Sequence, residues 1–376
     1  MHRLTLASFS QLCLLVLAAA ACLALAPQPA LAGDWDALIV RLQADGFDRE
    51  QLDALFSRPD AQFDPTAMGH KMLTLYRVKY GSNVVRRIQT RLAELGYDPG
   101  PVDGFAGFRT RWAIKMFQRL HNLPQDGMTS DALTRLLAGS PQRAPEGLTA
   151  PEKPASSGPA VYTSILTPRR LAEARAFFLE HQELLAQVHE TYGVPEDIAV
   201  ALLTVETRLG TFLGEDNAFT TLASMAACDQ LSDISAAMAE ETPTSSERQW
   251  LTTRMAEKAE WAYEELKALL TYCNDNNLDP LTMPGSIYGA VGICQFMPSS
   301  ALRWGVDGDQ DGTINLFDVA DALHSMANYL NEHGWDDSND SSRRQALYRY
   351  NHSHAYVNTI MALAEHLRAT GTIHGG

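Results

Sequence analysis

The sequence predicts a mainly α-helical, all-α protein that contains more than one domain. Apolar residues recur at helical spacing through residues 34–80 and most of residues 161–372, and no segment alternates apolar and polar residues as a strand does. The 376 residues suffice for roughly two to three domains. With 45% hydrophobic and 20% charged residues, the composition excludes a disordered, coiled-coil or collagen-like chain.

The charge is acidic and unevenly distributed along the chain. A net charge of −15 excludes a general binder of nucleic acid or of anionic membranes. Residues 81–138 carry 8 basic and 5 acidic side chains, whereas residues 161–376 carry 13 basic and 30 acidic ones. This difference predicts two modules with different surfaces.

Residues 1–32 are typical of a secretion signal. A short basic start precedes an apolar run from about Leu12 to Ala26, and Ala30-Leu31-Ala32 supplies the small residues of a cleavage site. The apolar run is shorter than the ~20 residues that span a bilayer, and no later segment is long and apolar enough to do so. We therefore expect an exported, periplasmic protein that begins near Gly33 and has no transmembrane segment.

The cysteines leave two questions open. Cys22 follows a run of alanines, so an outer-membrane lipoprotein attached through this residue is the alternative to a freely exported protein. After removal of the signal, Cys228, Cys273 and Cys294 remain, and an odd number allows at most one disulfide. Either Cys228 pairs with Cys273, or all three are buried free thiols. No Cys-x-x-Cys or His-x-x-x-His pair indicates zinc or redox chemistry.

Residues 81–138 predict a compact three-helix unit. Val84–Tyr97 is an amphipathic helix with a glycine stop near its end, and Asp98–Gly104 is dense in turn-forming residues. A second helix carries its apolar residues between Ala113 and Leu120, and a third runs from Asp131 to Leu137. A small helical domain without cysteines follows from this pattern.

This unit resembles the type 1 peptidoglycan-binding domain family. The resemblance covers nearly the whole unit and rests on Ile88-Gln89, Leu92, Leu95-Gly96-Tyr97, Val102-Asp103-Gly104, Gly107, Thr110, Ala113, Phe117-Gln118 and Asp126-Gly127. It implies cell-wall binding, although most of these residues build turns or fill the core. The alternative is a small domain that binds another polymer or nothing.

Residues 139–160 are a predicted linker with five prolines among serine, glycine and alanine. At ~3.1 Å per residue, an extended proline-rich chain of this length reaches on the order of 60–70 Å. We expect the linker to let the small domain move relative to the α-rich domain that follows. Helical periodicity in that domain covers Leu171–Tyr192, Pro195–Leu209, Glu247–Asn276, Asp318–His333 and Gln345–Arg368.

Glu206 is the candidate general acid. It lies beside the apolar stripe of the helix that begins near Pro195, and burial penalises the charged form of a carboxyl group. Such a carboxyl stays protonated near neutral pH and can donate its proton to a leaving group. The alternative is a surface glutamate paired with Arg208 or another base.

The surrounding motifs resemble the lytic murein transglycosylase B family. In chain order they are Val205-Glu206-Thr207-Arg208-Leu209-Gly210, Asn217-Ala218-Phe219, Thr221-Leu222-Ala223, Gly285 to Ser300, Ala327-Asn328-Tyr329-Leu330, His333-Gly334-Trp335 and Tyr350-Asn351-His352-Ser353. The resemblance implies a lysozyme-like α-domain formed by residues 33–80 and 161–376. Residues 81–138 would then be a wall-binding insertion that the linker, residues 139–160, returns to this domain.

The same resemblance implies roles for single residues. Glu206 matches the catalytic acid of the family, Gln295 a substrate-contacting glutamine, and Ser286 a serine associated with the substrate N-acetyl group. Further groove-lining positions are Tyr329, Tyr350 and Asn351. Each has a structural alternative, since the glutamine can cap a helix and the tyrosines can belong to the core. Cys294 departs from the family, which often has glycine before the glutamine.

A single carboxyl group predicts an unusual cleavage of sugar chains. Glycosidases ordinarily use two carboxylates, and the motifs contain no obvious partner for Glu206. The resemblance implies that this residue protonates the β-1,4 bond between MurNAc and GlcNAc in peptidoglycan and then takes the proton of the MurNAc C6 hydroxyl. The product is a 1,6-anhydro-MurNAc end. The alternatives are a lysozyme-type muramidase that hydrolyses the bond and a non-catalytic, calcium-dependent wall-binding protein.

Residues 307–318 match an EF-hand loop. Acidic residues occupy positions 1, 3 and 5, glycine position 6 and an apolar residue position 8, but position 12 is Asp318 instead of glutamate. In the resembling family the closing carboxylate comes three residues later. The expected Ca²⁺ ligands are therefore Asp307, Asp309, Asp311, the Thr313 carbonyl and Asp321. The ion would be structural, because catalysis by Glu206 needs no cofactor; the alternative is an Asp/Gly turn without metal.

Overall fold

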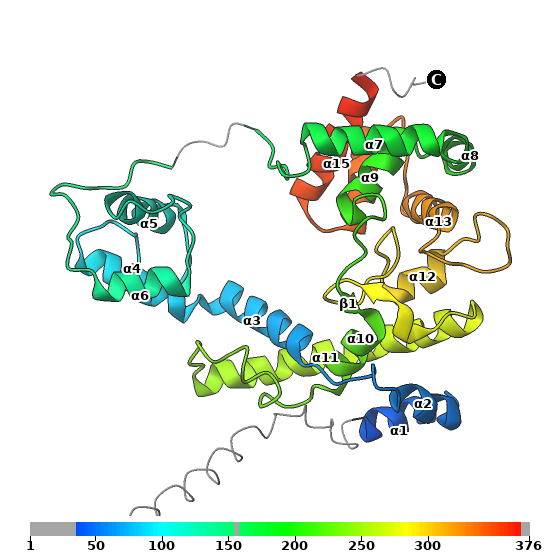
Figure 1. Ribbon diagram of the computed structural model, residues 1–376, viewed down its shortest axis with the longest axis horizontal. Coiled ribbons are helices and arrows are strands. Elements are labelled where there is room, and N and C mark those ends of the chain that lie inside the picture. The colour runs from blue at the N-terminus through cyan, green and yellow to red at the C-terminus, as the bar shows by residue number, and fades with distance from the viewer. Residues whose placement is uncertain (1–34, 154–157, 370–376) are drawn as a thin grey trace, which may run out of the picture.

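The computed structural model describes residues 35–153 and 158–369 (Figure 1). The predicted signal, residues 1–32, and Cys22 lie outside them. Helices dominate the described part, and its one sheet consists of two antiparallel strands, Asp216–Asn217 (β1) and Pro284–Gly285 (β2). The mainly α prediction is confirmed. None of the helices in the described ranges combines the length and the apolar character needed to cross a bilayer.

The helices before residue 140 are α1 (Asp36–Ala44), α2 (Arg49–Phe56), α3 (Thr66–Tyr80), α4 (Asn83–Glu94), α5 (Phe108–Leu120) and α6 (Asp131–Gly139). The later helices are α7 (Pro168–Glu180), α8 (Gln182–Tyr192), α9 (Glu196–Thr207), α10 (Ala218–Ala227), α11 (Ser245–Asp275), α12 (Pro298–Trp304), α13 (Val319–Glu332), α14 (Asp340–Tyr350) and α15 (His354–Ala369). A 3-10 helix, Pro280–Thr282, follows α11.

Helices α4, α5 and α6 form the small domain around a core of its own. The Gln89 side chain fixes its central turn, because its amide nitrogen donates to Asp103 Oδ1 and to Thr110 Oγ1 while its oxygen accepts from the backbone nitrogen atoms of Asp103 and Gly104. The predicted three-helix unit is confirmed. Its glutamine and Asp-Gly motifs build structure, as expected for fold-making residues.

A buried carboxylate holds the small domain against the rest of the molecule. Glu241, in the segment before α11, accepts from Arg77 Nε at the end of α3 (2.8 Å) and from the backbone nitrogen of Asn83 at the start of α4 (2.9 Å). Between these helices Gly81 has φ +76°, and a Cβ there would lie 2.5 Å from the Asp103 carbonyl oxygen. The small domain is therefore fixed at this junction (Figure 1).

The first part of the predicted linker lies along the small domain. The backbone nitrogen of Ala144 donates to the Leu95 carbonyl at 2.8 Å, and that of Ala150 donates to Asp98 Oδ2 at 3.0 Å. Ala144 and Leu148 pack against the small core. Only part of the predicted 22-residue linker, residues 139–160, is therefore left to connect the small domain to the large domain.

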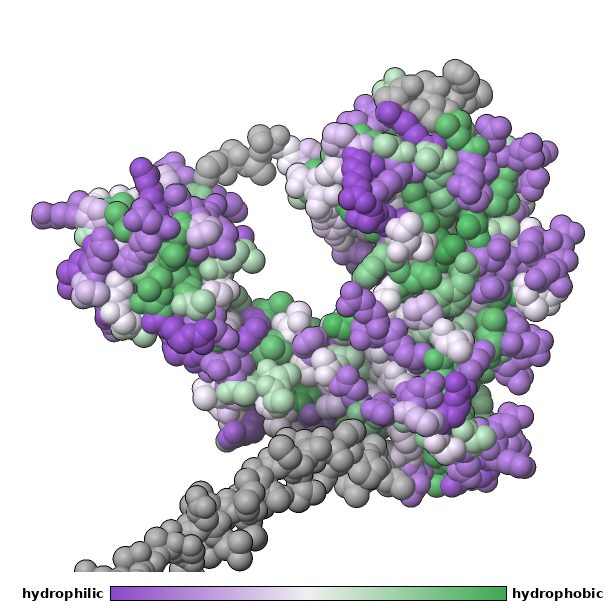
Figure 2. Space-filling model, viewed as in Figure 1, coloured by the Kyte–Doolittle hydropathy of each residue, from purple (hydrophilic) through white to green (hydrophobic). Residues whose placement is uncertain are grey.

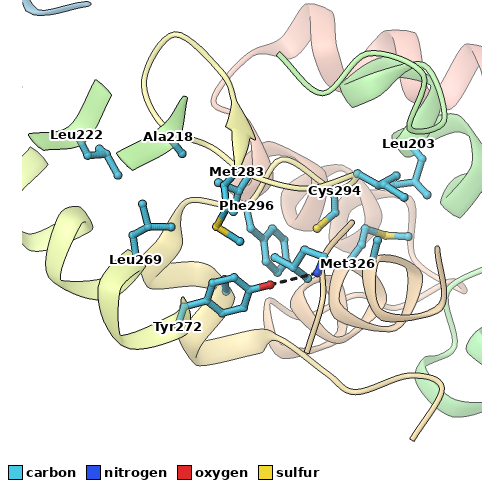
Figure 3. Close-up of a cluster of buried hydrophobic side chains, with 14 of the residues drawn as sticks. Leu203, Ala218, Leu222, Leu269, Tyr272, Met283, Cys294, Phe296 and Met326 are labelled. Carbon is cyan, nitrogen blue, oxygen red and sulfur yellow. Dashed lines mark hydrogen bonds between the residues drawn. The ribbon is translucent and has the colours of Figure 1, made fainter. Parts of the chain in front are cut away.

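The remaining helices share one large core. The 31-residue helix α11 begins at a capping box of Thr244 and Glu247, and α10 packs along it. Leu203 of α9 and Met326 of α13 meet Cys294 and Phe296 in this core (Figure 3). The 285–296 loop thus lies between the α10–α11 pair and helices α9 and α13, of which α9 carries the candidate acid Glu206.

The helix boundaries differ from the prediction in two places. The single helix expected over Leu171–Tyr192 is α7 and α8, interrupted at His181, and that over Gln345–Arg368 is α14 and α15. The second break has a local cause: Asn351 is extended, and the backbone nitrogen of Tyr356 donates to Ser353 Oγ, as is typical of a serine at a helix N-terminus. The break separates two parts of the candidate site.

Cys228, Cys273 and Cys294 are free and buried. Of the two open alternatives, the structure has the three free thiols and not the Cys228–Cys273 disulfide. Burial raises the pKa of each thiol to about 12. These cysteines therefore behave as small apolar core residues.

Candidate active site

Glu206 lies in the last turn of α9, immediately before the chain reverses. Arg208 and Leu209 both adopt left-handed backbone conformations, with φ 53° and 60°. Thr207 Oγ1 donates to the Ile293 carbonyl at 2.7 Å and ties the end of α9 to the 285–296 loop. At the other end of α9, Arg368 donates to the buried Asp197. Both ends of the helix are anchored, so the position of the carboxyl group is fixed.

The surroundings of Glu206 make it a near-neutral acid. Burial of its carboxyl group disfavours the charged form and raises the pKa to about 7, although the residue as a whole keeps some exposure. Tyr356 Oη donates to Glu206 Oε1 at 2.5 Å, and this bond opposes the rise by favouring the carboxylate. The group can therefore both give and take a proton near neutral pH. The alternative pairing with Arg208 is wrong, because Arg208 pairs with Glu173.

An aromatic cluster adjoins the acid. Tyr350 Oη donates to the Cys294 carbonyl at 2.6 Å, and the Tyr350 and Tyr329 rings meet edge to face with centroids 4.9 Å apart. Burial, together with nearby Cys294 and Glu206, raises the pKa of Tyr350 well above its usual value. Tyr329 Oη donates to the Arg349 carbonyl at 3.0 Å. The structure thus brings Glu206, Tyr350 and Tyr329 together.

Gln295 and Ser286 both shape the loop beside the acid. Gln295 has φ 53°, and its Nε2 donates to the Gly292 carbonyl at 3.1 Å, so it serves a tight turn and does not cap a helix. Ser286 Oγ accepts from the backbone nitrogen atoms of Tyr288 (3.3 Å) and Ala290 (3.0 Å). Asn351 is exposed in the α14–α15 break. These residues lie on loops around the site, outside the cluster that contacts Glu206.

Three of the expected metal ligands converge. Asp307, Asp309 and Asp321 each offer an oxygen within 4.8 Å of the other two. Asp311 is outside this group, because its carboxylate accepts from the backbone nitrogen (2.8 Å) and hydroxyl (2.6 Å) of Thr313. Asp318 caps the start of α13. The three convergent carboxylates suit a hard divalent cation such as Ca²⁺.

Comparison with known protein families shows to which family this chain belongs. A family model described as a transglycosylase SLT domain matches residues 112–345, which is more than half of the chain. The chain belongs to the transglycosylase SLT domain family. A second model, described as a peptidoglycan binding domain, matches residues 81–137. Both resemblances drawn from the sequence motifs are thereby confirmed at the level of the family.

Individual proteins match this SLT domain protein at low sequence identity or over only part of its length. The membrane-bound lytic murein transglycosylase B of Escherichia coli (strain K12) is 33% identical over 170 residues. That match covers 45% of this chain and 40% of the relative, so the chain spans less than half the length of the curated protein it matches. The E. coli lytic transglycosylase SLT35 in complex with bulgecin A is 21% identical, with 69% and 93% of the two chains covered and a TM-score of 0.46. Soluble lytic transglycosylase SltB1 from Pseudomonas aeruginosa is 22% identical, with 76% and 99% covered and a TM-score of 0.45.

Tyr356 is a site residue that the sequence analysis missed in this SLT domain. It lies 150 residues after Glu206 and reaches the acid because α15 packs on α9. A signal was present: Tyr356 follows Tyr350-Asn351-His352-Ser353 on the buried face of the next helix. A fully buried tyrosine usually has a hydrogen-bond partner for its hydroxyl, so a buried polar group opposite was to be expected.

Proposed function

We propose that this protein is a lytic murein transglycosylase that cleaves the β-1,4 bond between MurNAc and GlcNAc in peptidoglycan. The observation that carries the proposal is the single carboxyl group of Glu206, whose pKa burial raises to about 7. Among the described side chains, Tyr356 is its hydrogen-bond partner. Membership in the SLT domain family and the lytic murein transglycosylase among its relatives support the same assignment.

In the proposed reaction, protonated Glu206 donates its proton to the glycosidic oxygen as the bond to MurNAc C1 breaks. The substrate N-acetyl group stabilises the cationic centre, and the MurNAc C6 hydroxyl attacks C1. The Glu206 carboxylate accepts the hydroxyl proton and returns to its initial state. No water is consumed, because an intramolecular hydroxyl has a high effective concentration at C1. Tyr356 holds the carboxyl oriented through both proton transfers.

The test is mass spectrometry of purified peptidoglycan digested with the mature protein, beside an E206Q control. We expect muropeptides that end in 1,6-anhydro-MurNAc from the wild type and none from the variant, whose amide cannot donate a proton as an acid. Reducing ends, heavier by one water, would mean a hydrolase. Intact glycan that still retains the protein would leave a wall-binding scaffold.

The small domain is proposed to keep the enzyme on its insoluble substrate. It matches a peptidoglycan binding domain, and the Glu241 junction holds it in a set orientation. A second attachment to one polymer raises the effective concentration of the catalytic domain. The wall lies outside the cytoplasm, which agrees with the expected export and periplasmic location.

We also propose that the 307–321 loop binds a structural Ca²⁺. Asp307, Asp309 and Asp321 would hold the ion, because their oxygens converge and the exposed loop offers space for water ligands. Asp311 and the Thr313 carbonyl remain predicted ligands, and Asp311 reaches the ion only by giving up its bonds to Thr313. When bound, the ion would neutralise the repulsion among the carboxylates and stabilise the start of α13.

A further inference from the structure

Lys71 on α3 is an unpaired cation in an acidic protein. Its ammonium lies 4.2 Å from the centroid of the Tyr288 ring, and the residue is half-buried. Within the described ranges it forms no ion pair. By contrast, Lys267 on α11 pairs with Asp45 and Glu264 at 2.9 and 2.8 Å. The positive charge of Lys71 is therefore not neutralised by an ion pair with any described side chain.

A second cation adds to the positive potential at this point. Lys258 on α11 is near enough to lower the pKa of Lys71, after the larger effect of burial. Its own ammonium lies over the Trp261 ring at 5.8 Å, and it too makes no ion pair among the described residues. Two lysines that repel each other, with one partly desolvated, form an arrangement that an incoming anion would stabilise.

The Lys71 ammonium is held at the loop that carries a predicted substrate contact. Tyr288 lies two residues after Ser286, whose hydroxyl accepts from the Tyr288 backbone nitrogen. The loop cannot shift easily, because Gly289 has φ +84° and a Cβ there would lie 2.7 Å from the Leu222 side chain. The Lys71 ammonium therefore lies against a loop whose backbone is restrained.

We propose that Lys71 recognises a carboxylate of the peptide stem carried by the glycan substrate, with Lys258 raising the local positive potential. This inference rests on the proposed function. It adds a specificity determinant for the peptide to a site otherwise built for the sugar.

Charge complementarity favours this occupant. Peptide stems carry free carboxylates, whereas the glycan chain between them is uncharged. Residues 161–376 carry 30 acidic and 13 basic side chains, so the net charge of this part of the chain repels such stems. Lys71, with Lys258 nearby, would attract the carboxylate at the substrate loop and set which sugar enters the cleavage position. A bond to a charged group of this kind is worth roughly tenfold in affinity or more.

The experiment compares kcat/KM for the release of anhydro-MurNAc ends from three glycan substrates. The first has peptide stems with free carboxylates, the second has the same stems converted to carboxamides, and the third has no stems and only the lactyl carboxylate. The variants are K71Q and K71R, with K79Q as the matched control. Lys79 is on the same helix and also lies over an aromatic ring, Trp250 at 4.6 Å, but it is exposed at the far end of α3.

We expect the wild type, K71R and K79Q to prefer free carboxylates over carboxamides by roughly tenfold, and K71Q to show almost no preference. If K71Q lost kcat/KM equally on the free-carboxylate and carboxamide substrates, or kept the wild-type preference, the proposed role of Lys71 would be overturned. The proposed transglycosylase activity would be unaffected by either result. An equal effect of K71Q on stem-free strands would mean that Lys71 acts without the peptide stem and would overturn the stem assignment. Absence of anhydro ends with every substrate would overturn the proposed function, and this inference with it.

Discussion

Glu206 experiences two opposing influences on its pKa. Burial of the carboxyl raises the value to about 7, and the hydrogen bond from Tyr356 lowers it. A residue that must donate and then accept a proton works best when its pKa is near the working pH. The protonated form is present below pH ~7, so we expect activity to fall as the pH rises through this value.

Replacing Tyr356 with phenylalanine separates these influences. Without the phenol, the charged form of Glu206 loses its hydrogen bond, so its pKa rises and the alkaline limb of the pH–rate profile moves to higher pH. The maximal rate falls by roughly tenfold because the carboxyl is less well oriented. The matched control is Y350F, which removes a bond to the Cys294 carbonyl and not to Glu206. An alkaline limb that moves down, or moves equally in both variants, would contradict the proposed pairing.

Glu206 also has a stability effect that depends on pH. Its folded-state pKa of about 7 exceeds the ordinary value of 4.5, so its contribution to stability is present below pH 4.5 and is lost as the pH rises through 7. E206Q should therefore raise the free energy of unfolding at pH 8 by about 3 kcal/mol and change it little at pH 4.5. Denaturant unfolding at both pH values measures this difference. The same change at both would mean that the carboxyl is not held in its neutral form.

The sequence singles out Glu206 as the candidate acid but does not predict its hydrogen-bond partner, Tyr356. Helical spacing places the glutamate beside an apolar stripe, and motif order supplies its neighbours; both signals are local. The Tyr356 contact depends on how α15 packs against α9, which no short motif encodes. The same holds for Lys71, whose surroundings come from α3, α11 and the 285–296 loop.

A buried acid, Glu241, is central to the helix junction between α3 and α4. Glu241 accepts from Arg77 and from the Asn83 backbone nitrogen, and the charged acceptor strengthens both bonds. We expect E241Q to lower the free energy of unfolding by about 1–3 kcal/mol and to loosen the small domain in small-angle scattering. The control E240Q breaks only the exposed pair with Arg87 and should cost less than ~1 kcal/mol. Equal effects of the two variants would argue against a buried clamp.

In the 307–321 loop, the sequence spacing predicts the carboxylates that converge, but it does not predict the position of Asp311. Asp307 and Asp309 converge because alternate loop residues point to one side, and Asp321 joins them from the first turn of α13. The position of Asp311 is decided by local hydrogen bonds to Thr313, which spacing does not reveal.

Calcium should stabilise this loop through the convergent carboxylates. At about a hundred times its Kd, the ion should add ~2.7 kcal/mol to the unfolding free energy, and chelation should remove it. We expect D309N to lose most of this gain, because Asp309 belongs to the convergent group. D311N should retain more of it. The measurement is the calcium-induced shift in Tm; no shift in the wild type would contradict the metal site, and equal shifts in both variants would contradict the ligand set.

The molecule combines a large helical body with a small domain set to one side, and an opening lies between them on the face shown in Figure 2. The three-helix unit and its position in the chain were predicted, since compact domains carry their turn and core patterns locally. The way in which this unit is attached to the large domain was not predicted. The linker composition predicted free movement, but residues 140–150 lie along the small domain and Glu241 holds the other connection.

The central claim is that Glu206 cleaves the glycan without water. Its most direct test is to digest peptidoglycan in water labelled with oxygen-18 and to weigh the new MurNAc ends by mass spectrometry. A transglycosylase gives ends that carry no label and are lighter by one water than hydrolysed ends, and E206Q gives none. Labelled reducing ends from the wild type would contradict the claim.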